Sequence, residues 1–203
     1  MLESLEGDKE QEFNKSLEED EQLFNVIVEN VVATATLSQK MDLPSIFKTI
    51  NITEYDPKKF PGLIFRMNRP KTSTLIFSTG KMVCTGAKSE KEARRAIKRV
   101  VRILKQNSII ILNKPKIDIV NIVATSNLGK QIDLEKAFRK IEIAMYEPEQ
   151  FPGLIYRMSN PKTVNLLFSS GKIVCTGAKQ EKQVHKAIKK LSTTLQKKNL
   201  FYT

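Results

Sequence analysis

The feature that most constrains the fold is an internal repeat. A shift of 91 residues aligns the chain with itself without a gap, and 38 of the 71 positions from 30 to 100 are then identical. The repeated stretches include FPGLIFRM at 60–67 and FPGLIYRM at 151–158. The unit is too long for a solenoid repeat, and two copies are too few for an array. We therefore expect two similar halves that pack about a pseudo-twofold axis.

Each unit mixes strand and helix patterns. β-Branched residues alternate over 28–37, which predicts a strand. Asp42 is a suitable N-cap for a short helix over 43–50, and Ser89 for a long helix over 89–106. The second unit repeats this order and ends in a helix at about 180–198. Between the helices of the first unit we expect an extended piece at 53–55 and strands at 62–67, 72–78 and 81–87, which makes an α+β protein.

Several single residues carry expectations about burial. Phe47 and Phe138, on the two short helices, are expected in the core. Cys84 and Cys175 have no His or Cys cluster around them in the sequence, so we expect buried apolar roles rather than metal or redox chemistry. His185, the only histidine, lies on a basic helix and is expected to face solvent.

The charge of the chain points to a polyanionic partner. Its 34 Lys and Arg and 22 Asp and Glu give a net charge of +12. Residues 1–24 are acidic, with a net charge of −7, so the remainder carries about +19. We expect a disordered acidic tail and a basic body, with nucleic acid as the first partner class and an anionic membrane surface as the second.

Other classes of protein find little support in the sequence. No apolar stretch is long enough for a membrane span, and the N-terminus does not read as a signal peptide. Two cysteines form no disulfide framework, which favours a reducing interior. The phosphate-loop pattern fails at Gly80-Lys81 and Gly171-Lys172, because Leu75 and Leu166 occupy the positions of its first glycine. We see no nucleophile–base pair and expect no enzyme activity and no cofactor.

Alternation in the predicted strands leaves two interpretations open. In strand 72–78, Ser73, Leu75 and Phe77 share one face, and both faces are largely apolar. One interpretation is a sheet covered on both sides or buried in a dimer. The other is a face left open to bind a large, flat ligand, because soluble proteins rarely expose broad apolar patches without a function. Apolar side chains suit a polyanion mainly in a widened minor groove.

The sequence resembles the TATA-box-binding protein family over about residues 25–200. The motifs that carry the resemblance are Asn30-Val-Val-Ala-Thr, Glu54-Tyr-Asp-Pro, Phe60-Pro-Gly-Leu-Ile-Phe-Arg and Leu75-Ile-Phe-Ser-Thr-Gly-Lys-Met-Val-Cys-Thr-Gly-Ala-Lys, with their copies 91 residues later. The resemblance implies a saddle with a curved ten-stranded antiparallel sheet, a concave DNA face and four helices on the convex face. It divides the chain into a tail at 1–24 and repeats at 25–112 and 113–203, which form one structural domain.

The resemblance also implies roles for single residues. Two pairs of phenylalanines would wedge between base pairs, namely Phe60, Phe77, Phe151 and Phe168. Two asparagines, Asn30 and Asn121, would hydrogen-bond base edges. The groove floor would be contacted by Val32, Leu75, Val83, Thr85, Val123, Leu166, Val174 and Thr176. The DNA backbone would be contacted by Arg66, Lys71, Lys81, Arg157, Lys162 and Lys172.

The function implied by the resemblance is a general transcription initiation factor. It would bind and kink promoter DNA at a TATA box and recruit RNA polymerase with a B-class general transcription factor. The acidic loop residues Glu147, Glu149 and Gln150 would dock that factor, whereas the matching loop of the first repeat is basic at Lys58 and Lys59. A self-dimer in the free state is a further expectation.

Some alternatives remain at this stage. A generic basic RNA-binding protein, or a nucleic-acid enzyme carrying a similar domain, would share the basic charge. The FPGLIFR loop of the first repeat is similar to archaeal members, which implies an archaeal cytoplasm with association to the nucleoid. The acidic tail and basic body depart from many archaeal members, so the nucleus stays the alternative location.

Overall fold

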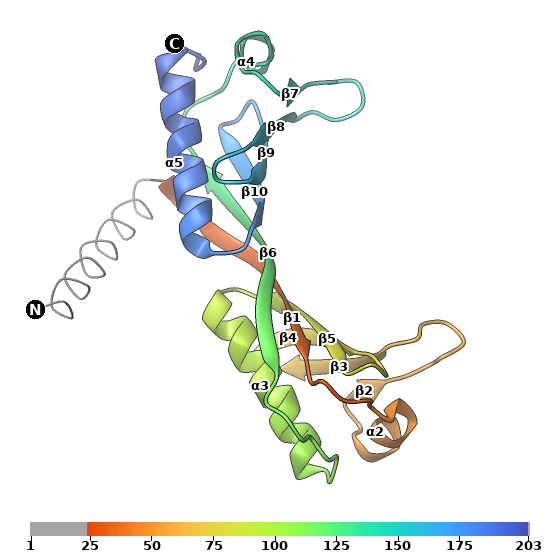
Figure 1. Cartoon of the computed structure of the whole chain (residues 1–203). Coiled ribbons are helices and arrows are strands. Elements are labelled where there is room, and N and C mark those ends of the chain that lie inside the picture. The colour runs from red at the N-terminus through yellow and green to blue at the C-terminus, as the bar shows by residue number, and fades with distance from the viewer. Residues whose placement is uncertain (1–23, 203) are drawn as a thin grey trace, which may run out of the picture. The chain divides into compact units, whose positions relative to one another are not determined.

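The computed structural model describes residues 24–202 (Figure 1). The acidic head predicted at 1–24 thus lies outside the described residues, apart from Phe24. Packing divides the described chain into two compact units. We call residues 29–122 the first-repeat unit, and residues 24–28 with 123–202 the second-repeat unit. The domain boundary predicted at 112/113 stays a prediction.

The first-repeat unit contains five strands and two helices in the predicted order. The strands follow one another across the sheet as β2-β3-β4-β5-β1. Each observed element lies within two residues of its predicted range. In chain order the elements are β1 (Ile27–Thr36), α2 (Leu43–Thr49), β2 (Thr53–Glu54), β3 (Leu63–Asn68), β4 (Lys71–Ile76), β5 (Lys81–Ala87) and α3 (Glu90–Gln106).

The second-repeat unit has the same organisation, with strand order β6-β10-β9-β8-β7. The ten strands belong to one antiparallel sheet, so the predicted ten-stranded sheet with four helices is confirmed for the described part of the chain. In chain order the elements of the second repeat are β6 (Lys116–Asn127, of which residues 123–127 belong to this unit), α4 (Leu134–Lys140), β7 (Ala144–Met145), β8 (Leu154–Met158), β9 (Thr163–Leu167), β10 (Lys172–Ala178) and α5 (Glu181–Lys197).

Side-chain caps fix where three of the helices begin. Asp42 Oδ1 accepts a hydrogen bond from the backbone N–H of Ser45 at 3.1 Å, and Asp133 Oδ1 accepts one from Lys136 at 2.9 Å. Ser89 Oγ accepts one from the N–H of Glu92 at 3.1 Å. Each bond satisfies a backbone donor that the first helical turn leaves without a partner. The predicted caps at Asp42 and Ser89 are therefore confirmed.

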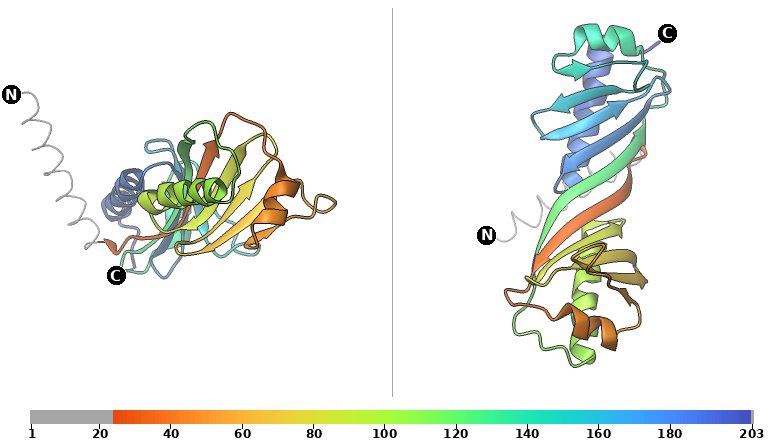
Figure 2. Two further views of the ribbon diagram at one scale, coloured as in Figure 1. Left: turned by 90° about the horizontal axis from the view of Figure 1, so that it is seen from below. Right: turned by 90° about the vertical axis from the view of Figure 1, so that its right-hand side faces the viewer.

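The core of each unit lies between its long helix and one face of its strands. Figure 2 shows α3 and α5 each crossing behind the strands of their own unit. Successive strand residues point to opposite faces, so every second residue meets the helix. In β3, for example, Leu63 and Phe65 are fully buried. The apolar side of α3 is buried along the whole helix, at Ala93, Ala96, Ile97, Val100, Val101 and Leu104.

Two predictions about burial are wrong. Phe47 and Phe138 are 44% and 45% exposed rather than part of the core. A helix of seven residues makes about two turns, so only a few of its side chains can face the core. In α2 these side chains are Leu43 and Ile46. Phe47 follows Ile46 and points outward, where its ring centroid lies 6.4 Å from that of Tyr55.

His185 is 5% exposed, so the prediction that it faces solvent is also wrong. The buried residues of α5 match those of α3 position by position, except that α5 adds His185 at the edge of the buried face. His185 lies one turn before Ile188 and two before Ser192, which are both buried. The matching position of the first repeat is Arg94, which reaches out to the carbonyl oxygen of Ile117 at 2.9 Å.

Cys84 and Cys175 are fully buried, which confirms the prediction made for them. Burial raises the pKa of the Cys84 thiol above its usual range and raises that of Cys175 to about 12. A neutral thiol loses less hydration free energy than a charged thiolate when it leaves water, so each buried cysteine keeps its proton in the folded state.

We expect neither thiol to react with a thiol-specific reagent at pH 8 in the folded protein, because the thiolate is the reactive form. Both should react after unfolding in urea. Above a pH of about 8.5 the unfolded chain releases these protons while the folded chain holds them, so the free energy of unfolding should fall as the pH rises. Absorbance of the released reagent counts reactive thiols, and fast labelling of the folded protein would contradict this account.

Candidate nucleic-acid interface

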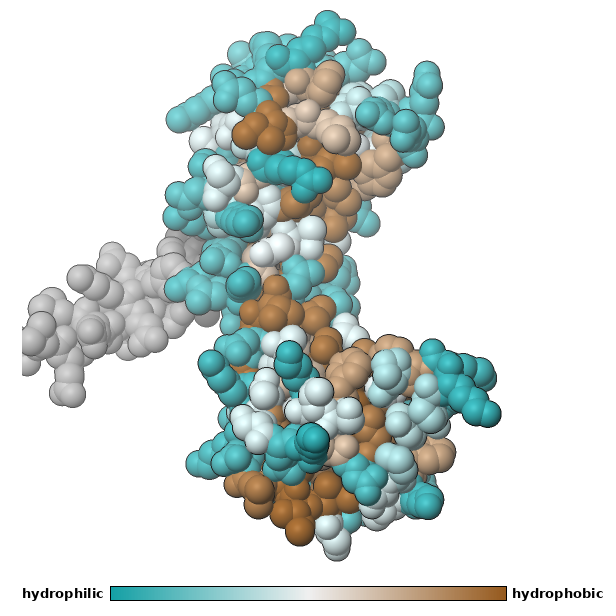
Figure 3. Space-filling model, turned by 45° about the vertical axis from the view of Figure 1, so that its right-hand side comes forward, coloured by the Kyte–Doolittle hydropathy of each residue, from teal (hydrophilic) through white to brown (hydrophobic). Residues whose placement is uncertain are grey.

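In each unit one sheet face lacks a covering helix, and its residues are only partly buried. In β4, Thr72, Thr74 and Ile76 are buried on the helix side, whereas Ser73 and Leu75 are half-buried on the other. The described residues therefore support the interpretation of an open face within each unit. We call this surface the open face. Figure 3 shows apolar side chains at the surface of each unit, with hydrophilic side chains around them.

The residues predicted to contact a groove floor all lie on this open face. Strand register brings them together in pairs, because Leu75 is opposite Val83 and Leu166 is opposite Val174. Neighbouring strands thus present adjoining apolar side chains. The full set is half-buried, at Val32, Leu75, Val83, Thr85, Val123, Leu166, Val174 and Thr176.

The four predicted wedge residues form two edge-to-face ring pairs, one in each unit. The ring centroids of Phe60 and Phe77 are 5.9 Å apart with an interplanar angle of 65°. Those of Phe151 and Phe168 are also 5.9 Å apart, with an angle of 68°. Phe77 and Phe168 directly follow β4 and β9, and their partners lie in the loops before β3 and β8. Each pair remains partly accessible, in contrast to the fully buried Phe65.

The glycine of each Pro-Gly dipeptide allows the ring pair to lie against the backbone. A Cβ atom on Gly62 would be 2.6 Å from Cε1 of Phe60 and 3.1 Å from Cε1 of Phe77. At Gly153 the corresponding distances to Phe151 and Phe168 are again 2.6 Å and 3.1 Å. A Pro-Gly dipeptide is a common turn signal. The structure adds that any side chain there would have to displace the rings.

Asn30 has a defined amide orientation on the open face. Its Oδ1 atom accepts hydrogen bonds from the backbone N–H of Gly86 at 2.8 Å and from the Thr85 hydroxyl at 3.2 Å. A backbone N–H is always a donor, so it identifies the atom that faces it as the amide oxygen. The NH₂ group is then the part of the side chain directed away from these partners. Asn121, the matching residue on β6, is likewise half-buried.

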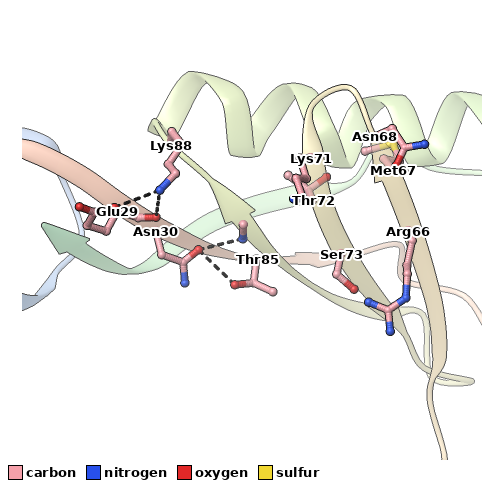
Figure 4. Close-up of a pocket in the computed structure, with 11 residues that line it drawn as sticks. Glu29, Asn30, Arg66, Met67, Asn68, Lys71, Thr72, Ser73, Thr85 and Lys88 are labelled. Carbon is pink, nitrogen blue, oxygen red and sulfur yellow. Dashed lines mark hydrogen bonds and ion pairs between the residues drawn. The ribbon is translucent and has the colours of Figure 1, made fainter.

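An open hollow of about 520 Å³ surrounds Asn30 in the first-repeat unit. In Figure 4 the side chains of Asn30, Ser73, Thr85 and Arg66 point to the side of the strands away from α3. Lys71 also lines the hollow. The side chains named here thus bring an amide, two hydroxyls and two bases to the hollow. These groups suit a ligand with hydrogen-bond acceptors.

The six bases predicted to contact a DNA backbone are all exposed, at Arg66, Lys71, Lys81, Arg157, Lys162 and Lys172. Arg66 has an acidic neighbour that sequence reasoning missed. Its Nε atom donates to Glu54 Oε1 at 2.8 Å, and its hydrogen bond and charge hold the pKa of Glu54 below the usual value. The two residues are 12 positions apart, so only the pairing of β2 with β3 reveals the contact.

The predicted partner-docking residues lie in the loop between β7 and β8. Glu147, Glu149 and Gln150 are exposed there, next to the ring pair of Phe151 and Phe168. The loop closes through the carbonyl oxygen of Glu147, which accepts from the N–H of Gln150 at 3.0 Å. In the first-repeat loop, the carbonyl oxygen of Asp56 accepts the corresponding hydrogen bond from the N–H of Lys59. The residues after Asp56 there include the bases Lys58 and Lys59. The two loops thus share a backbone arrangement and differ in charge.

Residues 24–202 contain no group of three or more His, Cys, Asp or Glu residues arranged to hold a metal ion. None of the helices described in that range is both long and apolar enough to cross a membrane.

Comparison with known proteins gives consistent matches over most of the chain. The model of the family described as "Transcription factor TFIID (or TATA-binding protein, TBP)" matches residues 25–107 and 116–198. The TATA-box-binding protein of Sulfurisphaera tokodaii is 55% identical over 166 residues, which cover 82% of this chain and 84% of the relative. That of Pyrobaculum aerophilum is 50% identical over 175 residues, covering 86% and 88%.

A solved structure, described as Methanococcus jannaschii TBP, is similar in fold. It matches with a TM-score of 0.78 and 42% sequence identity, over 85% of this chain and 98% of that chain. These organisms are archaea, which confirms that the resemblance is of the archaeal type.

The accessible ring pairs should contribute little to folding. Replacing Phe77 by Ala should lower the free energy of unfolding by roughly 1–2 kcal/mol, because the ring is only half-buried. Replacing the fully buried Phe65 by Ala should lower it by about 3–5 kcal/mol. Urea unfolding followed by circular dichroism measures both. An equal loss in the two variants would show that Phe77 is a core residue.

Proposed function

The chain belongs to the TATA-box-binding protein family, and from this we propose that it binds the minor groove of A·T-rich promoter DNA, kinks it, and nucleates the transcription initiation complex. The observation that carries the proposal is the open face of each unit. It combines apolar residues, a ring pair and exposed bases on a surface that no described helix covers. The matched relatives are TATA-box-binding proteins, so no catalytic step is proposed.

The chemistry of the open face favours A·T over G·C pairs. The minor groove of an A·T pair presents acceptors alone, whereas a G·C pair adds the amino donor of guanine. The oxygen of Asn30 is already engaged by Gly86 and Thr85, so this residue offers the groove N–H donors. A guanine amino group would meet a donor there and apolar side chains beyond it. An unpaired donor in a dry interface costs about 1–3 kcal/mol.

The ring pairs suit the kinking step. Inserting side chains between base pairs unstacks the step, which costs a few kcal/mol. Full burial of one phenylalanine side chain contributes roughly 1.5–3 kcal/mol. The rings are already partly buried in the free protein, so burying their remaining surface offsets part of the unstacking cost rather than all of it. Steps of the TA type are the easiest to deform, which adds to the preference for TATA sequences.

The exposed bases would supply affinity that does not depend on sequence. Lys and Arg contacts with phosphates release counterions, so binding weakens as the salt concentration rises. Such contacts position the protein on the duplex, and the apolar floor with its amides then selects the sequence. We propose this role for the six bases named above and place the protein at the archaeal nucleoid. A self-dimer in the free state, which would cover the open face, stays a prediction.

A gel-shift experiment at two salt concentrations tests the proposal. The protein should bind a TATA duplex at least tenfold more tightly than a duplex of the same length with G·C pairs in the box, because each mismatched pair costs about 1–3 kcal/mol. Energy transfer between dyes at the two duplex ends should report a bend. The variants Phe77→Ala and Phe168→Ala should reduce both the bend and the affinity.

The matched control is Tyr202→Ala, which removes an exposed aromatic side chain beside Asp133 and Lys136. It should leave the bend unchanged. Equal binding to both duplexes, or tighter binding to single-stranded RNA, would contradict the proposal and favour a general RNA-binding protein.

We further propose that the acidic loop of the second repeat docks the B-class general transcription factor and so sets the direction of the complex. The charges of Glu147 and Glu149 are exposed, and their counterparts Asp56 and Lys58 give the other loop a different charge pattern. The variant Glu147→Lys with Glu149→Lys should bind DNA with at least the original affinity but form the ternary complex at least tenfold more weakly. Unchanged ternary assembly and orientation in a gel shift with the purified factor would refute this role.

A further inference from the structure

Glu54 and Met145 occupy matching positions in the two repeats and differ in charge. Glu54 lies opposite Ile64 in the pairing of β2 with β3. Its carboxylate accepts from Nε of Arg66 at 2.8 Å and from Nη2 at 3.4 Å. Both side chains of this ion pair are 59% exposed. The guanidinium of Arg66 is therefore held in a two-point contact on the open face.

The second repeat lacks this carboxylate. Met145 lies opposite Ile155 in the pairing of β7 with β8, as Glu54 lies opposite Ile64. Met145 is 52% exposed, and Arg157 follows on β8 as Arg66 does on β3. Within residues 24–202, the guanidinium of Arg157 takes part in no ion pair. Two matching arginines thus have unlike surroundings.

We propose that Glu54 weakens the contact of Arg66 with the DNA backbone, so that Arg157 makes the stronger of the two arginine–phosphate contacts. The carboxylate uses the same N–H donors that would bind a phosphate, and its charge repels the phosphate from the same position. Glu54 and Met145 are then the residues that make the two halves hold DNA unequally. This inference rests on the proposed function.

The salt dependence of binding measures the effect directly. Each phosphate neutralised by the protein changes the slope of log K against log salt by about 0.9. Glu54→Met should free Arg66 and steepen the slope by up to that amount, which corresponds to about a threefold greater loss of affinity between 50 and 200 mM salt. Met145→Glu should pair Arg157 and flatten the slope to a similar degree.

Two controls separate the local contact from net charge. The double variant Glu54→Met, Met145→Glu has the composition of the original chain and should recover its slope. Glu142→Met removes another exposed charge, from the turn before β7, and should leave the slope nearly unchanged. Thermal unfolding of each variant checks that the fold is retained, and an exposed ion pair of this kind contributes little to stability.

The outcomes distinguish this proposal from the function on which it rests. A weaker, flatter salt response in Glu54→Met would show that the carboxylate orients Arg66 toward the phosphate, which would overturn the proposal. Equal slopes in Glu54→Met and Glu142→Met would overturn it as well. In both cases the preference for a TATA duplex would remain. Loss of that preference in the original chain would instead overturn the proposed function, and this inference with it.

Discussion

The packing of one long helix against one face of the strands is the constraint on which the rest of each unit depends. In the first-repeat unit, Ala93, Ala96 and Ile97 of α3 are fully buried, and so are Phe65 and Ile76 on the strands beneath them. This contact removes a large apolar area from water and supplies the main stabilising term. The opposite face of the same strands is left partly accessible, although alternation makes it apolar too. The residues that build the core and those proposed to bind DNA thus alternate along the same strands.

The polar groups of the open face are arranged by this same backbone. Gly86 in β5 brings its N–H to the side-chain oxygen of Asn30 in β1, 56 residues away in the sequence. The amide is therefore oriented before any ligand arrives, and little side-chain entropy remains to be lost on binding. The Phe60 and Phe77 rings are positioned in a similar way, because Gly62 leaves room for both. A surface fixed in advance by its backbone suits a rigid ligand such as a duplex.

The sequence predicted the order of elements and their ranges, because the two-residue period of strands and the caps of helices are local signals that the repeat then doubles. The residues of the open face came from the resemblance to the family, because alternation alone left two interpretations of that face open. Prediction from the sequence failed for Phe47, since a short helix offers few inward positions and Ile46 takes the one beside it. It failed for His185 because the width of a buried helix face depends on the neighbours that pack against it. The orientation of the Asn30 amide and the contact of Glu54 with Arg66 depend on strand register between distant segments. No local pattern contains that information.

The distribution of differences between the repeats suggests how a nearly symmetric surface acquires a direction. The residues proposed to contact the groove floor are identical in the two copies, with Val32 matching Val123 and Leu75 matching Leu166. Some of the differences lie at exposed positions such as Glu54 and Met145, which neither copy uses to build its core. Such changes cost little folding energy, because exposed charges are solvated in both folded and unfolded states. A minor groove of A·T pairs offers similar acceptors when read in either direction. Polarity therefore has to come from the rim and the loops, where the two copies of the unit have been free to diverge.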